Sequence, residues 1–347
     1  MICDDSVVIR SAVTRMLESD PRIKVVARVA DGAAAVAELS RQSIDVVVMD
    51  IEMPVMDGMT ALPLLLAADP SLRVIMASTL TTRGADIALR ALRLGAADYL
   101  PKPSSNAIQD DSFRRELIAK VTGLARLRRN TTASAPTVAG VAQPPLGLRP
   151  ASRQRPLLVA VGSSTGGPQA LFTLVQGLGR LVSVPVVLTQ HMPKSFTPIL
   201  AEHLGKLGGM PCHEANHGEM LQPGQIYLAP GDQHLLIESH GGKLRARLSD
   251  DPPENFCRPA VDPMLRSASA SCSGRVLVVM LTGMGHDGLA GTRAVIEAGG
   301  TAIAQDEPTS VVWGMPGAVA QAGLCHAILP LPAIAAKTLE LLESRNV

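Results

Sequence analysis

Acidic, hydroxyl and lysine side chains follow the ends of short apolar runs in the N-terminal third of the chain. Asp4 and Asp5 follow the first run, Asp50 follows a run of valines, and Ser78 and Lys102 follow two later runs. If the runs are parallel strands, these side chains meet at one edge of a sheet, in one crevice. Three carboxylates there would repel one another and attract a hard cation such as Mg²⁺. With the metal and Lys102 offsetting charge, Asp50 could accept a phosphoryl group, whose oxygens Ser78 could hydrogen-bond.

Any one of these acids, taken alone, is more simply explained as a solvated loop residue, and an isolated Asp-Asp pair carries little functional weight. Their combination is more specific, because DDS, MDIEMPVMDG, MAST and LPKP occur in order and at strand ends. Together they resemble the receiver domain of two-component signalling, over about residues 1–122. The resemblance implies Asp50 as the phosphoacceptor and Mg²⁺ as the cofactor of its phosphorylation. The metal site that it implies consists of Asp4, Asp5, Asp50 and the backbone carbonyl of Glu52. The switch and phosphoryl-binding residues that it implies are Ser78, Tyr99 and Lys102.

Two adjacent serines stand on a tight turn in the second half of the chain. The segment VAVGSSTGGP runs from an apolar strand through small residues into a predicted helix, and Ser163 and Ser164 lie at the turn. Such a turn aims backbone N–H groups and a helix N-terminus at one point, which suits a phosphate or a developing oxyanion. The segment matches neither the phosphate-binding loop nor the dinucleotide fingerprint, and it is not a strict G-x-S-x-G elbow. Alone it is a weak indication of chemistry.

A histidine and an aspartate follow the ends of two further apolar runs. His191 comes directly after VVLTQ, and Asp287 lies in the glycine-rich loop TGMGHDG. If all three runs are strands of one sheet, Ser164, His191 and Asp287 project from one edge and can form a proton-relay triad. His191 would take the serine proton, and Asp287 would orient the imidazole. The residues alone leave open Ser163 in place of Ser164, His286 in place of His191, and purely structural roles.

The motifs GSSTGGP, QHMP, GMGHDG and QDEPTSVVWGMP resemble the catalytic domain of the CheB family, the chemotaxis protein-glutamate methylesterases. With the receiver motifs, the resemblance covers almost the whole chain in the family's order. The triad that it implies consists of Ser164 as nucleophile, His191 as general base and Asp287 as third member. It also implies that Thr165 and Met284 lie beside the nucleophile, where their backbone N–H groups could bind the oxyanion. The segment 305–316 would line the rim of the site.

The resemblance implies hydrolysis of glutamate γ-methyl esters, and deamidation of specific glutamines, on methyl-accepting chemotaxis receptors during sensory adaptation. A chemotaxis histidine kinase would phosphorylate the receiver, which otherwise limits access to the esterase site. The esterase half is expected to need no cofactor. The main alternative is a second domain that only binds a nucleotide or a partner. A DNA-binding output is disfavoured because the second half is neither basic nor a compact helical motif. An esterase of a non-flagellar pathway stays open.

Composition limits the possible partners and the compartment. Net charge is +1, the isoelectric point is about 7.7 and aromatic residues make up 2%, so a nucleic-acid partner is not expected. The five cysteines lack metal-ligand spacing, which suits reduced thiols in the cytosol. The N-terminus does not have the pattern of a signal peptide, and no stretch has the length and apolarity of a membrane span. We therefore expect a cytoplasmic protein with no direct membrane insertion.

Alternating strand and helix patterns must position these residues. In the first part of the chain, strands are expected at 45–49, 73–77 and 97–100, and helices at 33–40, 60–67 and 84–94. A second α/β pattern has strands at 157–161, 184–188 and 276–281. The predicted fold is α/β: a flavodoxin-like receiver with a doubly wound parallel sheet, joined to a doubly wound α/β methylesterase domain. The predicted divisions are the receiver 1–122, a flexible linker 123–155 rich in Pro, Ala, Ser and Thr, and the catalytic domain 156–347.

The first strand is expected to be unusually short. Only Met1, Ile2 and Cys3 precede the acidic pair, whereas a central strand of such a sheet normally has several more apolar residues. Either the strand is truncated, or the assigned start of the chain lies downstream of the true one.

Overall fold

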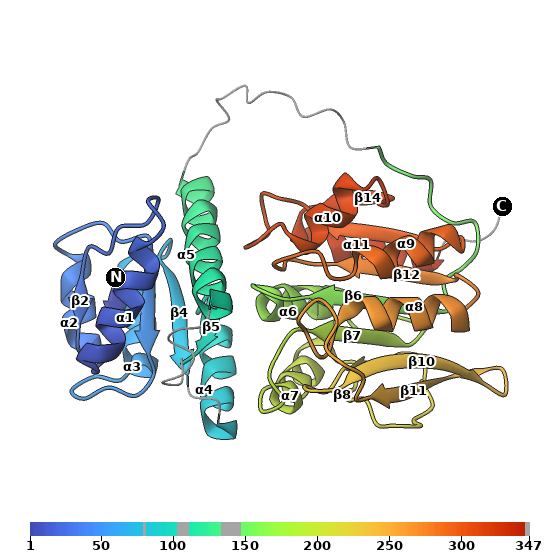
Figure 1. The fold of residues 1–347 in the computed structure, drawn as a ribbon, viewed down its shortest axis with the longest axis horizontal. Coiled ribbons are helices and arrows are strands. Elements are labelled where there is room, and N and C mark those ends of the chain that lie inside the picture. The colour runs from blue at the N-terminus through green and yellow to red at the C-terminus, as the bar shows by residue number, and fades with distance from the viewer. Residues whose placement is uncertain (79–80, 103–110, 133–146, 344–347) are drawn as a thin grey trace. The chain divides into compact units, whose positions relative to one another are not determined.

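A computed structural model describes residues 1–78, 81–102, 111–132 and 147–343. The chain divides into two compact units, Met1–Thr137 and Val138–Val347, each built on its own parallel sheet (Figure 1). This confirms the predicted α/β class. No helix in these described ranges combines the length and the apolarity that crossing a membrane requires.

The first unit is a five-stranded, all-parallel sheet with helices on both faces. Its strands are β1 (Ile2–Cys3), β2 (Arg28–Val29), β3 (Val46–Asp50), β4 (Arg73–Ser78) and β5 (Asp98–Pro101). They lie in the order β2-β1-β3-β4-β5, which is the order of flavodoxin-type sheets. Its helices are α1 (Val7–Glu18), α2 (Gly32–Leu39), α3 (Gly58–Ala68), α4 (Thr82–Arg93) and α5 (Asp111–Thr132). Helix α1 packs against α5, and α3 packs against α2 and α4.

The two central strands β3 and β4 form because their sequences are apolar throughout and can be buried on both faces. Every residue of β3 is buried, and so are all but the first of β4. Their parallel register places Asp50 opposite Ala77, and that of β4 and β5 places Ser78 opposite Pro101. The polar residues that end these strands therefore meet at one edge of the sheet.

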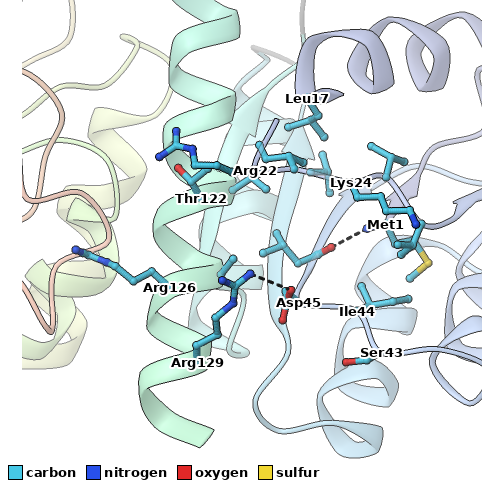
Figure 2. Close-up of a pocket in the computed structure, with 17 residues that line it drawn as sticks. Met1, Leu17, Arg22, Lys24, Ser43, Ile44, Asp45, Thr122, Arg126 and Arg129 are labelled. Carbon is cyan, nitrogen blue, oxygen red and sulfur yellow. Dashed lines mark hydrogen bonds and ion pairs between the residues drawn. The ribbon is translucent and has the colours of Figure 1, made fainter. Parts of the chain in front are cut away.

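Strand β1 is only two residues long, and a cavity lies beside its start. The amino group of Met1 donates a hydrogen bond to the backbone oxygen of Val46 at 2.8 Å, and burial lowers the pKa of this amino group to about 6. The adjoining cavity has a volume of about 430 Å³. Figure 2 shows the apolar side chains of Leu17 and Ile44 and the basic side chain of Arg129 among the residues around it. Space next to the start of β1 is thus left unfilled by the described side chains.

The second unit is a seven-stranded, all-parallel sheet. Its strands are β6 (Leu158–Ser163), β7 (Val186–Gln190), β8 (Cys212–Glu214), β9 (Ile226–Leu228), β12 (Val276–Met280), β13 (Thr301–Gln305) and β14 (Ala327–Leu329). Its helices are α6 (Gly167–Leu178), α7 (Thr197–Gly208), α8 (Val261–Ser271), α9 (Leu289–Glu297), α10 (Met315–Gln321) and α11 (Leu331–Glu343). Helix α6 packs against α7 and α11, whereas α8 packs against α9. An antiparallel hairpin of β10 (His234–His240) and β11 (Lys243–Ser249) packs against α8 through β10.

The order of the strands creates a switch point at the centre of this second sheet. The strands lie in the order β14-β13-β12-β6-β7-β9-β8. After β6 the chain continues on one side of the sheet with β7, and it later returns to the other side with β12. The carboxyl ends of β6, β7 and β12 are therefore neighbours at the position where open α/β sheets bind their ligands. All residues of these three strands are buried.

The segment predicted as a linker, 123–155, is only partly irregular in the structure. Helix α5 continues to Thr132, because Leu124 is buried in the core and Arg128 forms an ion pair with Asp69 at 2.8 Å. Residues 133–146 lie outside the described residues. From residue 147 the chain lies on the second unit, where the backbone N–H of Ser152 donates to Thr301 Oγ1 at 2.9 Å.

Candidate functional site

Three carboxylates converge at the carboxyl edge of the first sheet. One oxygen from each of Asp4, Asp5 and Asp50 lies within 4.8 Å of the others. Asp4 and Asp50 are buried and Asp5 is exposed, so the cluster has one side open to solvent. The ammonium of Lys102 lies 2.5 Å from Asp50 Oδ2 and 3.6 Å from Asp4 Oδ2. Three negative charges face one positive charge, and this set of oxygen donors fits a divalent cation.

The pKa shifts at this pocket follow from its burial and from the lysine. Burial raises the pKa of Asp50, although the contact with Lys102 acts in the opposite direction. Burial alone would lower the pKa of Lys102, but the hydrogen bond to Asp50 and the charges of the three carboxylates together outweigh burial and raise the pKa. The backbone N–H of Glu52 donates to Asp50 Oδ1 at 3.3 Å, which brings the main chain of Glu52 to the same carboxylate. A small cavity of about 20 Å³ lies between Asp50, Glu52, Ser78 and Lys102.

The two predicted switch residues are buried on neighbouring strands. Ser78 ends β4, and its backbone oxygen accepts a hydrogen bond from the N–H of Lys102 at 2.7 Å. Tyr99 lies in β5, and burial raises its pKa well above the usual value. The ammonium of Lys120 lies 5.3 Å from the centre of the Tyr99 ring and forms a buried ion pair with Asp98 at 2.7 Å. This pair was not predicted from the sequence, because a lysine in a helical pattern is usually solvated.

The serine turn at the end of β6 gives its two serines different environments. The hydroxyl of Ser163 is fully buried and donates to Gln190 Oε1 at 2.7 Å. Ser164, the next residue, is half-buried. The turn needs glycine at two places: Gly166 has a φ of 74°, and a Cβ on Gly167 would lie 1.9 Å from Gln190 Oε1. Ser163 is thus tied into the core, and Ser164 lies where a substrate can reach it.

Three hydrogen bonds hold the main chain of Ser164 in place. Its N–H donates to the backbone oxygen of Thr282 at 3.0 Å, and its carbonyl accepts from the N–H of Gly167 at 2.7 Å. The side-chain amide of Gln190 donates to the same carbonyl at 2.9 Å. A nucleophile on such a support has little freedom to move, which favours reaction with a well-placed substrate.

His191 and Asp287 form a close pair next to this turn. His191 Nε2 lies 2.7 Å from Asp287 Oδ2, and the side chains are 12% and 2% exposed. Burial alone would raise the pKa of Asp287, but its hydrogen bonds with His191 and with backbone donors keep it below the usual value. Burial alone would lower the pKa of His191, but its hydrogen bonds with Asp287 and Cys257 outweigh this and raise it to about 10. The alternative histidine, His286, is exposed.

Asp287 accepts an unusually large number of hydrogen bonds. Besides His191, its donors are Val261 N (2.6 Å), Asp262 N (3.0 Å), Gly288 N (2.9 Å) and the side-chain amide of Asn255 (2.9 Å). These donors stabilise the ionised carboxylate, which then accepts the proton on His191 Nε2 and thereby sets the tautomer of the neutral imidazole. The other ring nitrogen, Nδ1, is therefore the one that can act as a base.

Ser164 and His191 are adjacent at the ends of neighbouring strands. Ser163 pairs with Gln190 in the ladder of β6 and β7, and the N–H of His191 donates to the backbone oxygen of Ser163 at 3.1 Å. Ser164 and His191 are the residues that directly follow these two strands. Among the described residues, no hydrogen bond joins the hydroxyl of Ser164 to His191. His191 Nδ1 instead lies 3.4 Å from the sulfur of Cys257.

The loop after β12 lies directly against the serine turn. A Cβ on Gly283 would come within 2.9 Å of the Cβ of Ser164, so only glycine allows this approach. Among the described residues, no hydrogen bond is found from the backbone N–H groups of Thr165 and Met284, the two predicted to bind the oxyanion. The segment 305–316 packs on this loop, because the N–H of Gly283 donates to the oxygen of Val312 at 3.0 Å.

Two residues of the site were not predicted from the sequence. Asn255 and Cys257 come from a tight turn before α8, where Asn255 and Phe256 have φ values of 52° and 63°. Glu254 and Cys257 close the turn with a pair of backbone hydrogen bonds of 2.9 and 3.1 Å. Pro252, Pro253 and Asn255 indicate a turn here, but nothing in the local sequence indicates its contacts with Asp287 and His191.

Comparisons with known proteins cover nearly the whole chain. Residues 159–338 match the family model described as CheB methylesterase, and residues 1–111 match that of the response regulator receiver domain. A protein-glutamate methylesterase/protein-glutamine glutaminase of Rhodospirillum centenum is 54% identical, over 96% of this chain and 91% of that protein. One of Paramagnetospirillum magneticum is 50% identical, over 99% of this chain and 96% of that protein. The crystal structure of the Thermotoga maritima CheB methylesterase catalytic domain is 40% identical. The aligned region covers 54% of this chain and 98% of that domain, and the TM-score is 0.53.

Proposed function

Because the chain belongs to the CheB methylesterase family and has a response regulator receiver domain at its N-terminal end, we propose that it is a phosphorylation-controlled protein-glutamate methylesterase. Its substrates would be the γ-methyl esters of glutamates on methyl-accepting chemotaxis receptors, and it would also deamidate specific receptor glutamines. The names of the relatives support both activities. The observation that carries the proposal is the buried His191–Asp287 pair, set beside Ser164 at the switch point of the second sheet.

The proposed reaction is acyl transfer to water through a serine ester. Ser164 attacks the γ-carbonyl while His191 Nδ1 accepts the hydroxyl proton, and Asp287 stabilises the imidazolium that forms. The backbone N–H groups of Thr165 and Met284 bind the developing oxyanion. The imidazolium returns its proton to the leaving methoxide, methanol departs, and water then hydrolyses the acyl-enzyme by the same steps. Only a neutral imidazole can begin this sequence, so the raised pKa of His191 makes the reaction faster as the pH rises.

The receiver would control this reaction through Asp50. A chemotaxis histidine kinase would donate the phosphoryl group to the Asp50 carboxylate, and Ser78 and Lys102 would bind its oxygens. Mg²⁺, held by Asp5, Asp50 and the backbone carbonyl of Glu52 with Asp4 behind them, would neutralise charge on the phosphoryl group. The carboxylate cluster supports this, because it has an excess of negative charge and one side open to solvent. Tyr99 would respond to the change at Ser78. The proposed esterase reaction uses no metal. The protein would act in the cytoplasm, where the helical cytoplasmic part of the receptors lies.

Methanol release from methylated receptor tests the proposal. Ser164→Ala is expected to abolish release, because no other hydroxyl occupies the half-buried position at the turn. The matched control is Ser163→Ala, which changes the adjacent serine but leaves the nucleophile in place. Full activity of Ser164→Ala would exclude Ser164 as the nucleophile, and equal loss of release in a Ser163→Ala variant of unchanged stability would contradict the assignment of the two serines.

A further inference from the structure

The imidazole of His191 has a partner at each of its two nitrogens. Nε2 lies 2.7 Å from Asp287 Oδ2, and Nδ1 lies 3.4 Å from the sulfur of Cys257, which is within hydrogen-bond distance for sulfur. Four other donors hold the carboxylate of Asp287 in place and keep it ionised. Breaking its contact with Nε2 would therefore cost free energy. Nδ1 is therefore the nitrogen left to accept the proton of Ser164, and the sulfur of Cys257 occupies it.

The turn that supplies Cys257 is built around the His191–Asp287 pair. Its Asn255 side chain donates to Asp287 Oδ1 at 2.9 Å and to Asp262 Oδ2 at 3.0 Å. Two residues later, Cys257 contacts the other member of the pair. One short turn thus holds the carboxylate through an amide and the imidazole through a sulfur. Between them, the side chain of Phe256 points fully into solvent.

We propose that Cys257 is a positioning residue, which holds His191 through Nδ1 in the resting site and competes with Ser164 for that nitrogen. This inference rests on the proposed esterase function. Before the serine can lose its proton, the imidazole must exchange the sulfur of Cys257 for the hydroxyl of Ser164. The contact also stabilises the protonated imidazole, in which Nδ1–H donates to the sulfur, so it delays formation of the neutral base. Cys257 acts through His191 and takes no part in bond making.

The pH profile of kcat/KM for ester hydrolysis is the first test. In Cys257→Ala the acid limb is expected to move to lower pH by about one unit, as expected for the loss of one hydrogen bond to the protonated ring. On the acid side of the limb this raises kcat/KM up to about tenfold. Cys257→Ser retains an acceptor beside Nδ1 and is expected to keep a profile close to that of the wild type. Cys212→Ala, which changes another half-buried cysteine in edge strand β8, is the matched control.

An NMR titration of the His191 ring nitrogens separates this inference from the proposed function. The ring is assigned with His191→Gln, and its midpoint is expected to fall in Cys257→Ala but not in Cys212→Ala. A midpoint and an acid limb that are the same in Cys257→Ala and in the wild type would overturn the inference. If the midpoint falls but no protein releases methanol from methylated receptor, the contact between Cys257 and His191 stands and the esterase assignment fails.

Discussion

Asp287→Asn is expected to destabilise the second unit strongly although it changes only one atom of the side chain. The carboxylate accepts five hydrogen bonds, two at Oδ2 and three at Oδ1. An amide has one oxygen, so whichever way it turns, at least two donors face an NH₂ group. Each hydrogen bond to a charged group contributes about 1.5–3 kcal/mol, so the free energy of unfolding should fall by about 3 kcal/mol or more.

Urea unfolding followed by tryptophan fluorescence measures this loss. The chain has a single tryptophan, Trp313, which lies in the second unit and donates to the backbone oxygen of Gln305 at 2.9 Å. Its emission therefore reports on the unit that contains Asp287. The matched control is Asp250→Asn, because Asp250 is exposed and accepts one side-chain hydrogen bond, from Gln233. If Asp287→Asn stays within about 0.5 kcal/mol of this control, the network around the carboxylate does not contribute as argued.

Three further outcomes are expected. Asp50→Asn should leave basal methanol release intact and abolish its stimulation by a small phosphodonor; stimulation that persists would exclude Asp50 as the acceptor. Ser163→Ala should lower the free energy of unfolding by about 1 kcal/mol, because it removes a buried hydrogen bond to Gln190, and a loss of hydrolysis without this destabilisation would contradict the assignment of the two serines. The folded second unit should lose stability as the pH rises from 6.5 through about 10, because folded His191 has the raised pKa and keeps a proton that the unfolded chain releases. His191→Gln should remove this part of the pH dependence of the melting temperature, and an unchanged curve would argue against the raised pKa.

The strands that carry the site residues could be predicted because their sequences leave little choice. The runs expected at 45–49 and 73–77 correspond to β3 (Val46–Asp50) and β4 (Arg73–Ser78), each shifted or extended by one residue. Uninterrupted β-branched and apolar residues suit a strand buried on both faces, and the first polar residue then ends it. The convergence of Asp4, Asp5, Asp50 and Lys102 follows from that rule together with the parallel order of the strands.

Contacts between residues far apart in the sequence were beyond local patterns. The division between Ser163 and Ser164 depends on Gln190, 27 residues from Ser163, whose amide accepts from the first serine and donates to the carbonyl of the second. The roles of Asn255 and Cys257 depend on a turn with left-handed backbone at residues other than glycine. The extent of α5 depends on an ion pair between Arg128 and Asp69, which no helical period reveals.

The turn that carries Asn255 and Cys257 has a consequence for how the site moves. Left-handed backbone at a bulky residue such as Phe256 costs on the order of 1–3 kcal/mol, which the surrounding contacts must supply. The backbone of this turn relaxes when those contacts loosen. The turn is therefore the segment of the site whose local opening costs the least free energy. Amide hydrogens of this turn should then exchange faster than those of β6 and β7, which are buried at the centre of the sheet. The nucleophile and the base both follow rigid strands, whereas the turn that contacts the base through Cys257 is the yielding part of the site.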